Sequence, residues 1–152
     1  MMWVLVTTPV RADCETLRDV VAGSPTSDKF MRAVKFALTG WDEANVIVED
    51  RSNCVFRVDG LTRTKSQEIF YLNNVDHTKL KFRTRWQSFA DYWGPMVDVT
   101  LVGEQPVYED RATYGNRRGP ITANHYKLTV FTGEYKRQVR AWKYVYAHGC
   151  TG

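Results

Sequence analysis

The sequence has few cysteines and no long apolar run. Its 152 residues contain Cys14, Cys54 and Cys150, without a C-x-x-C spacing. Three thiols leave one unpaired in any set of disulfides, so we predict reduced thiols, as in a cytoplasmic protein. The segment WVLVTT near the N-terminus is too short for the apolar core of a signal peptide or for a membrane span. We therefore expect a cytoplasmic protein without a membrane segment.

Standard motifs for phosphate and metal binding are also missing. Neither G-x-G-x-x-G nor G-x-x-x-x-G-K-[ST] occurs, so no standard loop cradles a phosphate. The histidines are His77, His125 and His148, which lie in three different predicted elements without i, i+4 pairing. We expect no metal site.

What the sequence does have is the composition of a globular protein with a surplus of aromatic residues. Hydrophobic residues make up 43%, aromatic residues 13% and charged residues 25%. A chain of this length buries roughly 70% of the surface that its unfolded form exposes, and we predict a single domain over residues 1–152. The formal net charge of +4 permits a polyanionic partner without requiring one.

Runs of apolar and β-branched residues predict the strands. We expect strands over residues 2–8, 45–60, 68–75 and 96–102, and a closing hairpin formed by HYKLTVF and VRAWKYVYA around Thr132-Gly133. The apolar run 97–102 is interrupted by only one charge, Asp98, and is therefore predicted to be a buried central strand.

Capping residues and helical spacing predict the helices. We expect helices over residues 14–22, from Ser27 or Asp28 to Gly40, and from Asp76 or Thr78 to Trp93. The last of these should bury Phe82, Trp86 and Phe89, which recur at helical spacing. The order of elements predicts an α+β fold. It is typical of a ferredoxin-like (split βαβ) antiparallel sheet with two helices packed on one face, here with an added C-terminal hairpin.

Two glutamates lie at predicted strand ends. Glu68 opens one strand, and Glu104, followed by Gln105, ends the apolar run 97–102. A ferredoxin-like sheet can bring both toward one rim or toward a subunit interface. Carboxylates beside aromatic residues suit a ligand with positive charge. Alternatively, both are solvated strand ends.

Basic residues suggest a different function. Lys79, Lys81, Arg83 and Arg85 occur at alternate positions, which on the predicted helix would scatter them around its surface. A second set combines cations with aromatic rings and resembles a surface for single-stranded RNA: Arg111, Arg117, Arg118, Lys136, Arg137, Arg140 and Lys143, with Tyr114, Tyr135 and Trp142. A solvated charged edge that discourages aggregation is the alternative.

The N-terminal stretch WVLVTTPVRADCETL resembles the opening of the S-adenosylmethionine lyases of T3-like bacteriophages. The shared features are an aromatic residue, Val-Leu-Val, a hydroxyl residue, and then Cys14-Glu15. Asn53-Cys54 stands where that family has a Gly-Cys-Tyr turn, and FADYWGPMVDVTLV is similar to its second helix and fourth strand. The family's tyrosine is replaced here by Val55 and Phe56.

The resemblance implies a site and a reaction. The implied residues are Glu68 and Glu104 as catalytic groups, with Gln105, Phe56, Tyr71 and Tyr108 against the substrate. The contribution of the missing tyrosine's hydroxyl is either absent or supplied by another residue, such as Tyr71 or Tyr108. In the family's reaction the carboxylate of S-adenosylmethionine attacks its own γ-carbon, which releases methylthioadenosine and homoserine lactone. No metal or bound cofactor is required.

The resemblance also implies a homotrimer with substrate sites between subunits, and a phage role in depleting the methyl donor of host restriction and methylation. Two other functions stay open at this point. One is a basic RNA-binding regulator, similar in element order to phage translational repressors of the RegA type. The other is an inhibitor of a host protein that has no enzymatic activity.

Overall fold

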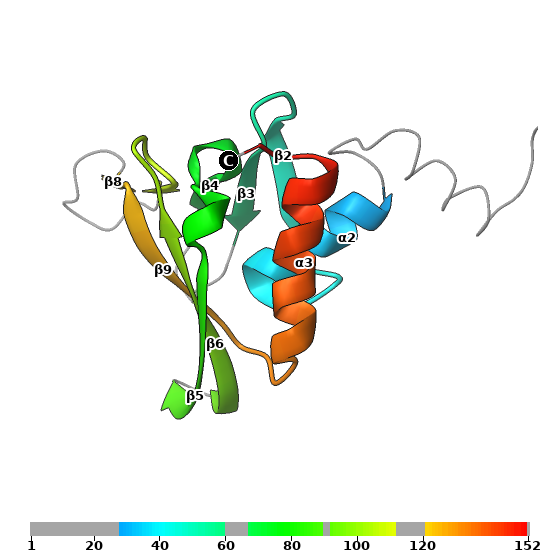
Figure 1. Cartoon of the computed structure of the whole chain (residues 1–152). Coiled ribbons are helices and arrows are strands. Elements are labelled where there is room, and N and C mark those ends of the chain that lie inside the picture. Colours follow the sequence, from blue (N-terminus) through cyan, green and yellow to red (C-terminus); the bar gives the residue numbers. More distant parts are fainter. Residues whose placement is uncertain (1–27, 60–66, 90–91, 112–120, 152) are drawn as a thin grey trace, which may run out of the picture.

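The computed structural model describes residues 28–59, 67–89, 92–111 and 121–151. The predicted strand 2–8 and helix 14–22 lie outside these residues. The described part of the chain is α+β, with two helices and two antiparallel sheets (Figure 1). None of its helices is long and apolar enough to cross a lipid bilayer.

The larger sheet has the strand order β2-β3-β4-β7-β8. Its strands are β2 (Val46–Asp50), β3 (Val55–Asp59), β4 (Gln67–Tyr71), β7 (Tyr108–Asp110) and β8 (Ile121–Ala123). Two of the predicted strand regions, 45–60 and 68–75, are thereby confirmed in part. The first contains two strands and a turn, and the second ends in a 3₁₀ turn, η1 (Leu72–Asn74).

The smaller sheet has the order β5-β6-β9, with β5 (Lys81–Phe89), β6 (Tyr92–Val102) and β9 (His125–Val130). The central strand is β6, and the side chains of Val97, Val99 and Leu101 are buried in the core. The predicted central, buried strand over 97–102 is confirmed.

The two sheets are joined by one bent ribbon in which β6 continues into β7 and β8 continues into β9. The backbone N–H of Gly103 donates to Asn124, and that of Val107 donates to Ala123, at 2.9 and 2.8 Å. Glu104 and Gln105 lie between these bonds, in an excursion where the ribbon changes sheet, as at a β-bulge. A Cβ at Gly103 would approach the carbonyl oxygen of Asn74 to 2.0 Å, so only glycine fits there.

The helices α2 (Asp28–Thr39) and α3 (Tyr135–His148) pack against each other and share one core with the sheets. The predicted helix from Ser27 or Asp28 to Gly40 is confirmed. In α3 the buried residues Gln138, Ala141, Trp142 and Val145 recur at helical spacing. The amide of Gln138 donates to the Phe36 carbonyl and accepts from the Trp142 indole, which joins the helices inside the core.

The helix predicted over residues 76–93 is wrong. After η1 and a second 3₁₀ turn, η2 (His77–Lys79), the chain forms β5, which pairs with β6 from Lys81↔Thr100 to Phe89↔Tyr92. The segment also alternates with period two, and tertiary pairing selects that period. Phe82 is half-buried and Trp86 is 63% exposed, so Trp86 is not the core residue that helical spacing indicated.

The predicted C-terminal hairpin is also wrong, because only its first half is a strand. β9 follows the prediction, but the aromatic and β-branched residues 139–147 belong to α3. Their strand-like composition is overridden by the core, which they meet once per helical turn. With the second helix at the C-terminal end, the split βαβ order of a ferredoxin-like fold is not confirmed.

Cys54 and Cys150 form a disulfide between residues 96 positions apart in the sequence, with their Cα atoms 5.8 Å apart. The expectation of reduced thiols is therefore wrong for these two residues, and Cys14 lies outside the described residues. The bond ties the beginning of β3 to the residues after α3, and both cysteines are buried. Such bonds are typical of oxidising environments. The cytoplasmic location stays a prediction.

Candidate functional site

Glu68 is a buried carboxylate, with 6% of its surface exposed. It lies on the inner face of β4, beside Phe70 and opposite Asp110 of β7. Its Oε1 accepts hydrogen bonds from the hydroxyl groups of Tyr108, at 3.0 Å, and Tyr126, at 3.4 Å. Burial raises the pKa of Glu68, although the bond from Tyr108 partly opposes this. Neutral donors thus hold the carboxylate, which loses favourable solvation free energy on burial.

The two tyrosines form a stacked pair beside Glu68. Their ring centroids are 3.7 Å apart with an interplanar angle of 6°, and Phe70 meets both rings edge-on. Burial, followed by the negative charge of Glu68, raises the pKa of Tyr126 to about 12 and also raises the pKa of Tyr108. Both hydroxyls therefore stay protonated and act as donors at neutral pH.

Glu68 also lines a cleft of about 210 Å³ that runs along the edge of β9. Tyr126 and Leu128 contribute the inner face of this strand, and Leu38 and Thr39 contribute the end of α2. Arg85 and Lys127 line the cleft from the opposite face of the smaller sheet. One cleft thus combines a buried carboxylate, an aromatic ring and two cations.

The second carboxylate near the cleft, Asp98, has a different environment from that of Glu68. Arg85 donates to it at 2.5 and 3.2 Å, and Thr129 donates at 2.8 Å. Burial alone would raise the pKa of Asp98, but these bonds outweigh burial and lower it. The negative charge of Asp98 is thus balanced by the guanidinium of Arg85. Glu68, by contrast, forms no ion pair within the part of the chain that the structure describes.

Tyr71 and Phe56 do not join this cleft. Phe56 is fully buried in the core, 6.3 Å from Phe30 between ring centroids. Tyr71 points to the outer face of the larger sheet, where its hydroxyl donates to Glu109. Of the aromatic residues expected at the site, only Tyr108 lies beside Glu68.

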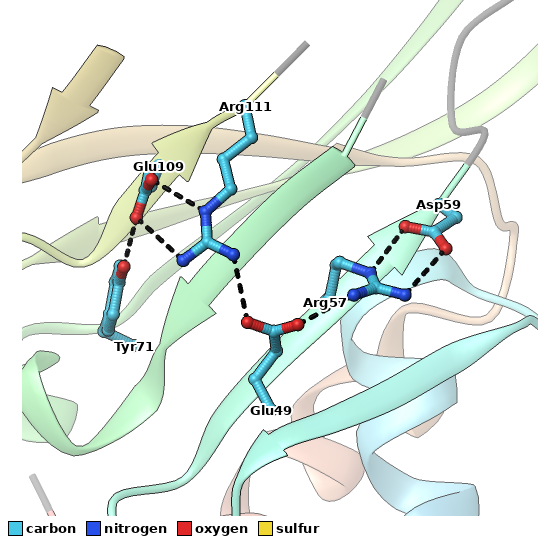
Figure 2. A network of polar contacts seen from close by, with 6 residues as sticks. All are labelled: Glu49, Arg57, Asp59, Tyr71, Glu109 and Arg111. Carbon is cyan, nitrogen blue, oxygen red and sulfur yellow. Dashed lines mark hydrogen bonds and ion pairs between the residues drawn. The ribbon is translucent and has the colours of Figure 1, made fainter. Parts of the chain in front are cut away.

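The outer face of the larger sheet carries a polar network that joins β2, β3, β4 and β7 (Figure 2). Its six members are Tyr71, Glu109, Arg111, Glu49, Arg57 and Asp59. Arg111 is 2.8 Å from Glu109 and 3.0 Å from Glu49, and Arg57 is 2.8 Å from Glu49. Arg111 lowers the pKa of Glu109. The charges satisfy one another above the buried Ile69, so we interpret the network as structural.

Glu104 and Gln105 are exposed and lie far from Glu68 within one chain. Glu68 is near the first end of β4, whereas the excursion packs on η1 beyond the other end, where Asn74 donates to Pro106 at 2.7 Å. A strand rises about 3.3 Å per residue, which puts Glu68 and Leu72 about 13 Å apart. The two predicted catalytic glutamates therefore do not meet inside one subunit.

Sequence reasoning did not single out Tyr126, Arg85 or Lys127 for this site. Tyr126 was assigned to a strand, and its alternation with Leu128 and Val130 was the only signal that it faces inward. Within the described residues no group of three or more histidine, cysteine or acidic residues could hold a metal ion.

Comparison with protein-family models, with curated proteins and with solved structures finds no match for this chain. The function therefore has to be inferred from the chemistry of the Glu68 cleft. The most informative feature is the contrast between Asp98, which a guanidinium neutralises, and Glu68, whose hydrogen-bond donors among the described residues are phenol groups.

Proposed function

We propose that the protein is a lyase that cleaves S-adenosylmethionine, with the amino-acid end of the substrate bound at Glu68. The supporting observation is the buried carboxylate of Glu68, whose hydrogen-bond partners among the described residues are neutral. An ammonium group in the cleft would compensate the solvation that Glu68 loses on folding.

The size and lining of the cleft fit the methionine end of the substrate. Sites for drug-sized ligands are usually about 300 to 1,000 Å³, whereas this cleft has about 210 Å³. It therefore takes the amino-acid part and leaves the nucleoside outside. The face of the Tyr126 ring suits the sulfonium, because aromatic faces attract cations.

The change of charge during the proposed reaction determines which group of the substrate Glu68 can usefully bind. A carboxylate oxygen of the substrate forms a bond to the γ-carbon, the bond from that carbon to sulfur breaks, and its electron pair stays on sulfur as a neutral thioether. The negative and positive charges cancel, so a carboxylate on the sulfonium would stabilise the substrate more than the transition state. We therefore assign Glu68 to the α-ammonium group, which keeps its charge throughout.

In this role Glu68 binds and orients the substrate and takes no proton. Fixing a flexible chain so that its carboxylate faces the γ-carbon, in a site with little water, contributes up to roughly 7 to 11 kcal/mol in favourable intramolecular reactions. Tyr108 and Tyr126 hold the carboxylate in place for this contact.

The test is to incubate the purified protein with S-adenosylmethionine and to separate the products by chromatography. Methylthioadenosine and homoserine lactone should appear in equal amounts, and Glu68→Gln should lower their formation at low substrate concentration. Failure of the wild-type protein to form methylthioadenosine would exclude the lyase reaction.

The resemblance to the phage lyases extends this proposal to a ferredoxin-like core, a homotrimer and a role in depleting the host's methyl donor. In a trimer, the exposed Glu104 and Gln105 of one subunit would approach the Glu68 cleft of its neighbour. Size-exclusion chromatography with light scattering measures the molar mass of the protein and therefore tests the trimer. If the protein is a monomer and Glu104→Gln keeps full activity, the site is restricted to the Glu68 cleft of one chain.

A further inference from the structure

The outer face of the smaller sheet, which is the face turned away from α2 and α3, carries a row of cations. Lys81, Arg83 and Arg85 alternate along β5 and therefore share one face of the strand. Lys81 and Arg83 are exposed, and Arg85 is partly exposed beside Asp98. The same alternation would disperse these residues around a helix. The basic row exists only because the segment pairs with β6.

A further cation extends this face across the sheet. Lys127 of β9 and Lys81 of β5 both lie opposite Thr100 of β6, and Lys127 is exposed. The next row across the sheet is Arg83, Asp98 and Thr129. Among the described residues of this face, four cations surround the single carboxylate of Asp98, which Arg85 already engages. The described part of this face is therefore positively charged.

An exposed aromatic ring marks the opposite face of β5. Trp86 follows Arg85 directly on β5, which is an edge strand, and 63% of its surface is exposed. Because successive residues of a strand point to opposite faces, this ring lies on the face of Phe82, away from Lys81, Arg83 and Arg85.

We propose that this face binds a single-stranded nucleic acid, with its phosphates on Lys81, Arg83 and Lys127. Alternate residues of a strand are about 7 Å apart, a spacing that suits successive phosphates of an extended chain. A single strand fits better than a duplex, because an extended chain can follow the row of cations, whereas the strands of a duplex wind around an axis. Arg85 and Lys127 also line the Glu68 cleft, whereas Lys81 and Arg83 do not.

The experiment uses fluorescence anisotropy with three labelled oligonucleotides of equal length: single-stranded RNA, single-stranded DNA and duplex DNA. The wild-type protein should bind the single strands more tightly than the duplex at low salt. The double variant Lys81→Gln/Arg83→Gln should reduce the slope of log K against log salt by about 1.4, because each phosphate contact on a single strand contributes about 0.7. The loss should be equal for different sequences.

Trp86→Ala is a control on the opposite face of β5. It should leave the affinity for the single strands and the salt slope near their wild-type values. Because the ring is exposed, circular dichroism should show an unchanged fold.

The matched control is Lys136→Gln/Arg140→Gln, which removes the same charge from exposed positions of α3. This pair should leave the affinity and the salt slope near their wild-type values. Equal losses in both double variants would show that only net charge matters and would overturn the proposal. Absence of binding at low salt, or equal competition by polyglutamate, would also overturn it. Methylthioadenosine formation by Lys81→Gln/Arg83→Gln should be unchanged, so the two proposals fail independently.

Discussion

At the scale of single residues, Glu68 combines a cost in stability with the proposed role in binding. Its burial raises its pKa, so the folded chain holds the Glu68 proton more tightly than the unfolded chain does. Residues that bind ligands often lower stability in this way, because their partner is absent until the ligand arrives.

Glu68→Gln should therefore change stability in a pH-dependent manner. The contribution of protonated Glu68 is complete below the unfolded pKa, near 4.5, and is lost as the pH rises through the raised folded pKa. The glutamine cannot ionise, and its carbonyl can still accept from Tyr108. We expect similar melting temperatures for the variant and the wild type near pH 4, and a higher value for the variant at pH 7 to 8. A difference that is constant with pH would contradict this explanation.

Kinetics separate binding from chemistry at the same residue. Because the α-ammonium group keeps its charge during the reaction, Glu68→Gln should raise KM by about 10- to 100-fold and lower kcat much less, which corresponds to roughly 1.5 to 3 kcal/mol for a charge-assisted contact. Glu104→Gln makes the same chemical change at an exposed position. A large fall in kcat in Glu68→Gln, with KM unchanged, would assign Glu68 to the chemical step instead.

At the scale of elements, two segments have local patterns that fit more than one structure. In β5 the bulky residues fit helical spacing and the charges fit period two, and pairing with β6 decides between them. In α3 the composition favours a strand, but the core accepts Trp142 and Val145 on one helical face. Propensity differences of less than about 1 kcal/mol per residue are easily outweighed by such packing.

Substitutions of two tryptophans test this difference between α3 and β5. Trp142 is fully buried and donates to Gln138, so Trp142→Ala should lower the free energy of unfolding by about 3 to 5 kcal/mol. Trp86 is mostly exposed, and Trp86→Ala should change the free energy of unfolding by less than about 0.5 kcal/mol. Urea titrations followed by circular dichroism measure both. A cost at Trp86 comparable to that at Trp142 would contradict the strand assignment of β5.

At the scale of the whole molecule, the disulfide joins the beginning of β3 to the residues that follow α3. Cys54 and Cys150 close a loop with a separation of 96 residues. A loop of that size loses about 4 to 5 kcal/mol of chain entropy in the unfolded state when it is cross-linked. Much of the stability of the α3 packing therefore depends on whether this bond is present.

Reduction should lower the melting temperature of the wild-type protein and leave that of Cys54→Ser/Cys150→Ser unchanged. The double variant should lose up to about 4 to 5 kcal/mol, because the unfolded chain regains the freedom that the bond removed. Cys14→Ser is the control, and its melting temperature should still respond to reductant. Identical melting curves with and without reductant in the wild type would exclude the bond.

The sequence by itself determined the elements whose signals are local. The helix from Asp28 and the central strand 97–102 follow from apolar spacing together with capping or turn residues, which act over a few neighbouring positions. The position of Glu68 at the beginning of a strand follows for the same reason. The α+β class was therefore predictable, although the order of its elements was not.

Only the tertiary structure decided which residues meet. Tyr108 and Tyr126 reach Glu68 across 40 and 58 residues of sequence, and Cys150 reaches Cys54 across 96. No local pattern encodes contacts over such separations, because they depend on strand register and on the path of the chain between elements. The same holds for the row of Lys81, Arg83 and Arg85, since the period that places them on one face is selected by pairing with β6.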